Sequence, residues 1–112
     1  MKEQNRNIRI IGVDAYGSIL KKYHETGKID KNEIYSYRIE GLGKNIVPST
    51  TDFKIIDKFV KVKDSESAHM SREITLKEGL FVGYTSGAAM QAVYLLNDES
   101  EFNNDSHIVI IF

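Results

Sequence analysis

Residues 8–14, which read IRIIGVD, place the strongest constraint on how this chain can fold. The segment is rich in β-branched side chains and shows no regular polar face, a pattern typical of a strand covered on both sides. Such strands occur in parallel sheets whose two faces are packed by helices. We therefore predict a strand at residues 8–14 and an α/β fold.

Two further segments are expected to extend the sheet. Residues 58–62, KFVKV, alternate between charged and apolar side chains and predict an edge strand. Residues 107–112, HIVIIF, are almost entirely apolar and predict a central strand with neighbours. Together with flanking helices, these segments predict a partial three-layer open sheet of mostly parallel strands. We expect residues 1–112 to form a single domain.

A helix is predicted from Asp64 or Ser65, either of which could cap it, to about Glu78. Lys77 suits the last turn because a cation there complements the helix dipole, and Gly79 suits the C-terminal stop. By contrast, residues 19–32 are charged and lack an apolar rhythm, so they predict a solvated excursion. In that segment His24 is expected to be an exposed surface histidine.

Residues 78–92, EGLFVGYTSGAAMQA, are the strongest candidate for a ligand site. A short apolar run ends at Gly83, and a Ser/Thr pair then precedes a helix predicted at residues 86–96. This order leaves backbone N–H groups at the helix start free to bind an anion. The sequence also allows a plainer interpretation, in which this is a buried helix whose alanines let it pack closely.

Two other segments offer weaker signals of a site. Asp14 ends the first predicted strand, where ligands bind in parallel sheets, although it could equally hold its own turn. Gly41 and Gly43 permit close approach of a ligand to the backbone or a positive φ. They lack the third glycine and the following helix of a dinucleotide fingerprint, so dinucleotide binding is rejected.

Charge and composition exclude several kinds of partner. The chain has 15 Lys plus Arg against 16 Asp plus Glu, a net charge of -1, so no basic field exists to attract nucleic acid. There is no cysteine, which removes disulfides, thiolate metal sites and a cysteine nucleophile. The longest apolar run is far too short for a membrane span. We expect a soluble, cytoplasmic protein without a membrane or nucleic-acid partner.

Several motifs, in order along residues 8–112, resemble one enzyme family. They are residues 12–20 (GVDAYGSIL), 40–43 (EGLG), 57–58 (DK), 78–80 (EGL) and 83–88 (GYTSGA), together with Pro48. The chain resembles the second half of the catalytic domain of cystathionine β-synthase and cysteine synthase. These are pyridoxal-phosphate-dependent enzymes of fold type II, the tryptophan-synthase-β type. The first motif is more similar to the cystathionine β-synthases than to the cysteine synthases.

The resemblance implies a set of cofactor-binding residues. Residues 40–43 match a loop that borders the cofactor ring, and residues 83–87 match a turn near the floor of the active site. Glycine suits both because a flat ring and a substrate carboxylate approach the backbone only where no Cβ intrudes. The implied cofactor-binding residues are Glu40, Gly41, Leu42, Gly43, Gly83, Thr85, Ser86 and Gly87; no catalytic residue and no metal ligand is implied.

The family's Schiff-base lysine and phosphate-binding loop match no motif in this sequence. We therefore expect the complete enzyme to bind pyridoxal phosphate and an amino-acid substrate, and this chain alone to bind no cofactor and to be inactive. The alternatives are a non-catalytic α/β module that binds a partner and an α/β domain without a ligand. An unpaired apolar sheet edge would favour self-association.

Overall fold

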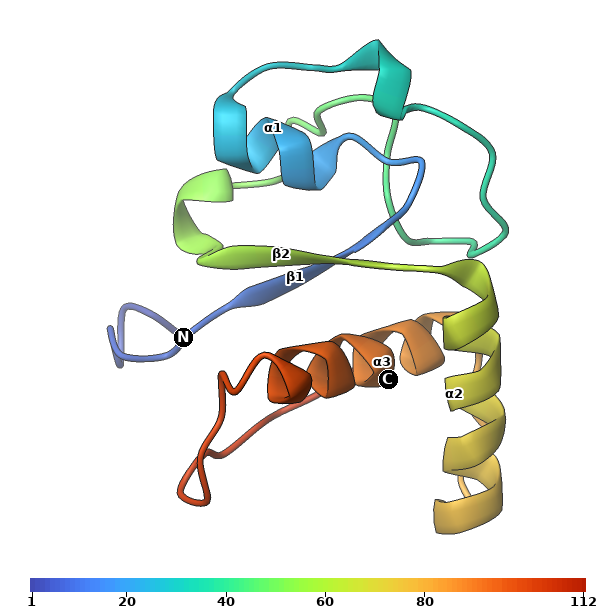
Figure 1. Ribbon diagram of the computed structural model, residues 1–112. Coiled ribbons are helices and arrows are strands. Elements are labelled where there is room, and N and C mark those ends of the chain that lie inside the picture. The colour runs from blue at the N-terminus through green and yellow to red at the C-terminus, as the bar shows by residue number, and fades with distance from the viewer.

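The computed structural model describes all 112 residues (Figure 1). Its main elements follow the order β1 (Ile11–Ala15), α1 (Leu20–Thr26), β2 (Lys58–Val62), α2 (Asp64–Glu78) and α3 (Tyr84–Asp98). Two single turns of 3₁₀ helix, Lys31–Glu33 and Phe53–Ile55, lie in the long connection between α1 and β2. The expected strand at residues 58–62 and the expected helix ending at Glu78 are confirmed.

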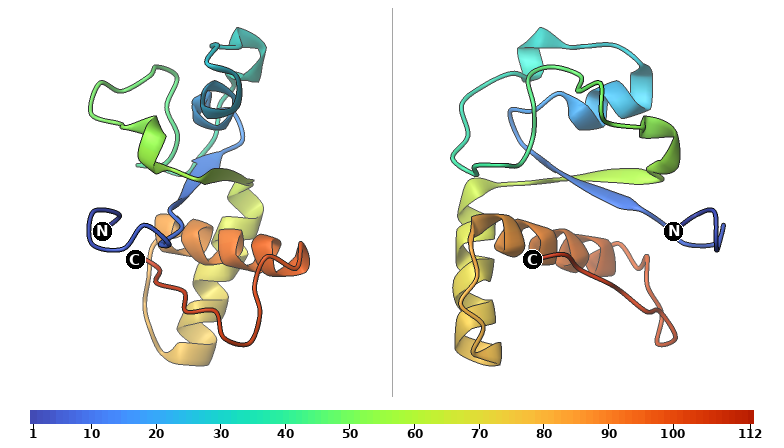
Figure 2. Two further views of the ribbon diagram at one scale, coloured as in Figure 1. Left: turned by 90° about the vertical axis from the view of Figure 1, so that its left-hand side faces the viewer. Right: turned by 180° about the vertical axis from the view of Figure 1, so that it is seen from behind.

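The strands β1 and β2 pair in parallel, with Ile11 opposite Lys58 and Ala15 opposite Val62. Helix α1 lies on one face of this sheet, and α3 lies on the other with α2 beside it (Figures 1 and 2). Helix α1 contacts β2, and α3 contacts both strands. The predicted α/β class, with parallel strands between helical layers, is confirmed.

The hydrophobic core lies between the sheet and α3. Val60 and Val62 of β2 meet one face of α3, and Ile39 from the long connection closes the cluster. The face that α3 contributes is formed by Ala88, Ala92 and Leu96. Two alanines on this face let the α3 backbone approach the strands closely. Each fully buried Val, Leu or Ile side chain contributes about 1.5–3 kcal/mol relative to an exposed one.

The strand expected at residues 107–112 is wrong, because this segment has no regular structure. It runs along α3 on the side away from the sheet (Figure 2) and does not join the two strands. A strand requires a hydrogen-bonded neighbour, and none lies alongside these residues. As a result Val109 and Ile111 are 87% and 89% exposed.

The first strand is also shorter than expected, beginning at Ile11. The preceding residue, Ile10, is engaged by Asp57. The Ile10 N–H donates to the Asp57 carboxylate at 2.7 Å, and the Asp57 N–H donates to the Ile10 carbonyl at 2.9 Å. This side-chain contact takes the place of a regular ladder bond just before the strand.

The expected solvated excursion at residues 19–32 contains helix α1, so that prediction is wrong. His24 is half-buried on this helix and not an exposed surface residue. Its Nε2 lies 2.8 Å from the Ile56 carbonyl oxygen, and its ring meets the Phe59 ring edge-on at 5.3 Å. Packing of aromatic rings against β2 thus stabilises a helix that the charged sequence does not predict.

No helix combines the length and the apolar composition that crossing a membrane requires.

Candidate functional site

The loop at residues 38–45 crosses the edge of the sheet where both strands end. At its start, the Arg38 and Ile39 N–H groups donate to the Asp64 carboxylate at 2.9 and 3.3 Å. At its end, the Lys44 carbonyl accepts the Ile19 N–H at 3.0 Å. Because Asp64 follows β2 and Ile19 follows β1, the loop spans the carboxyl edge, where ligands of parallel α/β sheets bind.

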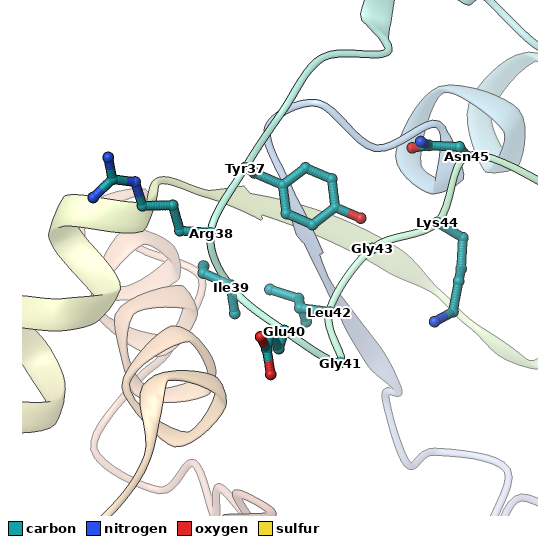
Figure 3. A pocket seen from close by; sticks show the side chains of 9 residues that line it. All are labelled: Tyr37, Arg38, Ile39, Glu40, Gly41, Leu42, Gly43, Lys44 and Asn45. Atoms are coloured by element: carbon teal, nitrogen blue, oxygen red, sulfur yellow. The ribbon is translucent and has the colours of Figure 1, made fainter.

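This loop borders a shallow, open groove of about 390 Å³. Figure 3 shows that the loop folds back on itself with the Tyr37 ring between its two arms, while Arg38 and Lys44 point outward. Burial, together with the charge of Asp14, raises the pKa of the Tyr37 hydroxyl. The lining consists of Tyr37, Arg38, Ile39, Glu40, Gly41, Leu42, Gly43, Lys44 and Asn45.

The turn at residues 83–87 meets the loop at residues 38–45 at the start of α3. Gly83 is the N-cap residue of this helix, and no side chain caps it, so the first N–H groups of the helix lack a side-chain partner. Gly41 has a φ of +81°, and a Cβ built on it would lie 3.8 Å from Cγ2 of Thr85. Two segments more than forty residues apart thus face each other.

Four of the eight predicted cofactor-binding residues are exposed at this junction, namely Glu40, Gly41, Gly83 and Thr85. The side of Gly83 where a Cβ would stand is open, with no atom within 4 Å. These four residues are available to a ligand, and the structure places them on two neighbouring segments.

The other four predicted residues are held in the packing of the chain. Leu42 lies against the core cluster, and Ser86 is 6% exposed. Gly43 is buried with a φ of +71°, and a Cβ on it would lie 2.8 Å from Cβ of Ser18 and 2.9 Å from the Tyr37 hydroxyl. Gly43 is therefore needed for the fold of the loop itself.

Gly87 also has a packing role. A Cβ at this position would overlap the Ser67 carbonyl oxygen and lie 2.8 Å from the Ser71 amide nitrogen of α2. The Gly87 N–H is already bonded to the Gly83 carbonyl at 3.2 Å. Gly87 thus allows α2 and α3 to cross in contact, and that crossing fixes where α3 begins. Direct contact between Gly87 and a cofactor stays a prediction.

Asp14, whose role the sequence left open, holds its own turn. Its carboxylate accepts the Ala15 N–H and the Lys21 N–H, each at 3.0 Å, and the residue is completely buried. Both carboxylate oxygens are engaged by the turn and by the first turn of α1. Asp14 is therefore a structural residue beneath the site.

Asp64 was expected to be a possible helix cap, and this is wrong. Helix α2 begins at Asp64, its N-cap residue is Lys63, and no side chain makes a capping bond there. The Asp64 carboxylate binds the loop at residues 38–39 instead. Sequence analysis missed this role because it depends on a contact between segments far apart in the chain.

The chain holds no group of three or more His, Asp or Glu side chains that could bind a metal ion.

The fold and the site together define an α/β protein with a glycine-lined cleft at the carboxyl edge of parallel strands. Residues 1–112 match the family described as pyridoxal-phosphate dependent enzyme, over the whole chain. The chain belongs to this family, as its resemblance to the fold type II enzymes implied.

Individual relatives include cystathionine β-synthase of Saccharomyces cerevisiae, which is 39% identical over 113 residues. That match covers 100% of this chain and 22% of the yeast protein. Cystathionine β-synthase of Apis mellifera is 37% identical over 99% of this chain and 21% of its own length. Cysteine synthase of Buchnera aphidicola is 28% identical over 99% of this chain and 34% of its own length. The chain thus spans about a fifth of the length of the cystathionine β-synthases.

The fold is shared with a solved structure, the crystal structure of O-ureido-L-serine synthase. The two superpose with a TM-score of 0.69 at 21% identity, over 87% of this chain and 28% of that one. The α/β architecture expected for this family is confirmed.

Proposed function

We propose that this chain forms one wall of the active site of a pyridoxal-phosphate-dependent enzyme that replaces the β-substituent of serine or an activated serine, giving cystathionine or cysteine. Its similarity to cystathionine β-synthases and a cysteine synthase supports this activity. The observation that carries the proposal is the meeting of Gly41 with Thr85 at the uncapped start of α3. The two predicted cofactor-binding segments are neighbours there, which supports a ligand site shared between them.

The residues of this cleft fit a flat ring that carries anionic groups. The absence of a Cβ at Gly41 and Gly83 leaves the two sides of the junction open to close approach. The free N–H groups at the start of α3, together with the helix dipole, favour a carboxylate or a phosphate oxygen. Pyridoxal phosphate, when bound, supplies an electron sink for the α-carbon of the substrate.

The contribution of this chain is to bind and to orient. The uncapped N–H groups of Tyr84 and Thr85 would hold a carboxylate in a fixed direction, and Thr85 adds a hydroxyl on the exposed side. Glu40 and Gly41 form the tip of the facing loop and would cover the ligand from the other side. The attachment of the cofactor and the proton transfers are assigned to residues outside these 112.

A chimera tests this function. The matching segment of the Saccharomyces cerevisiae enzyme is replaced by residues 1–112, and turnover of serine with homocysteine is measured together with the absorbance of bound cofactor. The chimera is expected to bind the cofactor and to form cystathionine. The chain alone is expected to show neither property, because we propose that the tethering lysine lies elsewhere.

Matched variants of the chimera locate the cleft. Gly41→Val should lower turnover by at least about tenfold, because its side chain would enter the cleft beside Thr85. Gly27→Val is the control, since Gly27 also has a positive φ, +68°, and no neighbour within 4 Å. A chimera that binds the cofactor but forms no cystathionine, or equal losses in both variants, would contradict the proposal.

A second candidate function, an association module, is favoured by the exposed apolar segments. Leu80 and Phe81 are 51% and 96% exposed, and the segment at residues 107–112 is exposed as well. Self-association of the chain through these residues is expected to appear in sedimentation equilibrium and to weaken in Phe81→Asp. A protein that stays monomeric at high concentration would refute it.

A cytoplasmic location likewise stays a prediction.

A further inference from the structure

Ser18 makes every hydrogen bond that a serine hydroxyl can make, and two of them go to the loop at residues 38–45. Its Oγ accepts the Lys44 N–H at 2.9 Å and donates to the Lys44 carbonyl at 3.1 Å. It also accepts the Leu20 N–H at 3.3 Å, at the start of α1. One donor and two acceptors are the full capacity of a hydroxyl, and Ser18 is completely buried.

The surrounding contacts make this attachment rigid. The neighbouring Ile19 N–H donates to the same Lys44 carbonyl at 3.0 Å. Gly43 packs directly on Cβ of Ser18, where no larger residue would fit. The Asp14 carboxylate fixes the turn on the other side through the Ala15 and Lys21 N–H groups. Ser18 is therefore held in place by β1 and α1 and in turn holds the loop.

The loop is fixed at its other end by Asp64, while its tip is exposed to solvent. The Asp64 carboxylate binds the Arg38 and Ile39 N–H groups, and Ile39 is 1% exposed. Between these anchors, Glu40 and Gly41 are exposed. The spacing between Gly41 and Thr85 is thus set by anchors that lie outside the cleft.

We propose that Ser18 is the positioning residue of the cofactor-facing loop, acting with Asp64 to set the distance between its tip and the start of α3. This inference rests on the proposed function. Ser18 does not itself touch the ligand. It fixes Lys44 and Gly43, so that the tip at Gly41 faces Thr85 before any ligand arrives.

Amide hydrogen exchange of the 112-residue chain, followed by nuclear magnetic resonance, tests this role. In Ser18→Ala the Lys44 amide loses its acceptor, and its exchange should accelerate by about tenfold relative to that of Ala92 in the core. The resonances of Gly41 and Thr85 should shift as well. If Ser18→Ala does not fold, Ser18→Cys, which keeps a weak acceptor of similar shape, is measured in its place.

Ser67→Ala is the matched control. Ser67 is equally buried, and its hydroxyl bonds the Lys63 carbonyl at 2.9 Å at the start of α2, away from Lys44. A loss of stability alone would accelerate exchange alike in both variants. The proposal is overturned if the Lys44 amide exchanges no faster in Ser18→Ala than in Ser67→Ala. Because no cofactor is present, this result is independent of whether the chimera is active.

Discussion

Gly87 offers a direct test of how the start of α3 is fixed, through the variant Gly87→Ala. The added methyl group would overlap the Ser67 carbonyl oxygen and lie 2.8 Å from the Ser71 amide nitrogen. Both contacts are backbone atoms of a regular helix and cannot rotate away as a side chain would. The two helices would have to separate, and the well-packed contact between α2 and α3 would be lost.

The size of the effect follows from two opposing terms. Overpacking of a close contact costs about 1–3 kcal/mol, and contact with rigid backbone places Gly87→Ala at the upper end. Replacing a helical glycine by alanine returns about 1 kcal/mol through helix propensity. The net loss in the free energy of unfolding is about 2 kcal/mol. For a chain of this length, that loss lowers Tm by about 8 °C.

Thermal unfolding followed by circular dichroism measures this shift, with Gly83→Ala as the control. A Cβ at Gly83 meets no atom within 4 Å and the residue has a φ of -83°, so only the poorer capping by alanine applies. That term is at most about 1 kcal/mol. A Gly87→Ala protein more stable than the wild type would refute the packing argument, since helix propensity would then be the only effect.

Two further predictions concern the loop and the N-terminal strand. Gly43→Ala should lower the free energy of unfolding in urea by at least about 2 kcal/mol, from a strained positive φ and from overlap with Ser18. Gly41→Ala, which shares the positive φ but has no contact closer than 3.8 Å, should cost about 1 kcal/mol; equal losses would contradict this. The hydrogen bond from the Ile10 N–H, reinforced by Lys2, lowers the pKa of Asp57. Its stabilisation is therefore present above the ordinary carboxyl pKa of about 4 and is lost as the pH falls through the lower folded pKa. Asp57→Asn should be less stable than the wild type at neutral pH and equal to it in strong acid; a difference independent of pH would refute the assignment.

Local patterns were sufficient to predict the elements that carry their own signals. Residues 58–62 alternate as a strand must, and Gly79 ends α2 in the left-handed conformation that favours glycine. The helix expected at residues 86–96 exists but begins at Tyr84, directly after its cap Gly83. Such boundaries depend on the cap geometry, which the sequence shows only in part.

The misses share one physical cause, namely interactions between distant segments. Helix α1 has only seven residues and no buried residue of its own, so its stability comes from Asp14 and from ring packing of His24 against Phe59. At residues 107–112 the sequence predicted a strand that does not form, because an apolar composition does not make a strand without a hydrogen-bonded neighbour. Half of the predicted site residues lie at an exposed junction, and their contact with a cofactor stays a prediction, while Gly43 and Gly87 serve packing that no local motif reveals.

The anchoring of the loop at Ser18 and Asp64 has a consequence for the thermodynamics of recognition. Ordering a free backbone costs about 1–2 kcal/mol for each residue fixed, and a binding site that is disordered when empty must recover this cost from its ligand. Here the two stems are immobilised in the empty protein, so only the two residues at the tip still have conformational freedom to lose. A ligand that enters the cleft therefore has to offset the ordering of only these two residues, in addition to its own lost translational and rotational freedom.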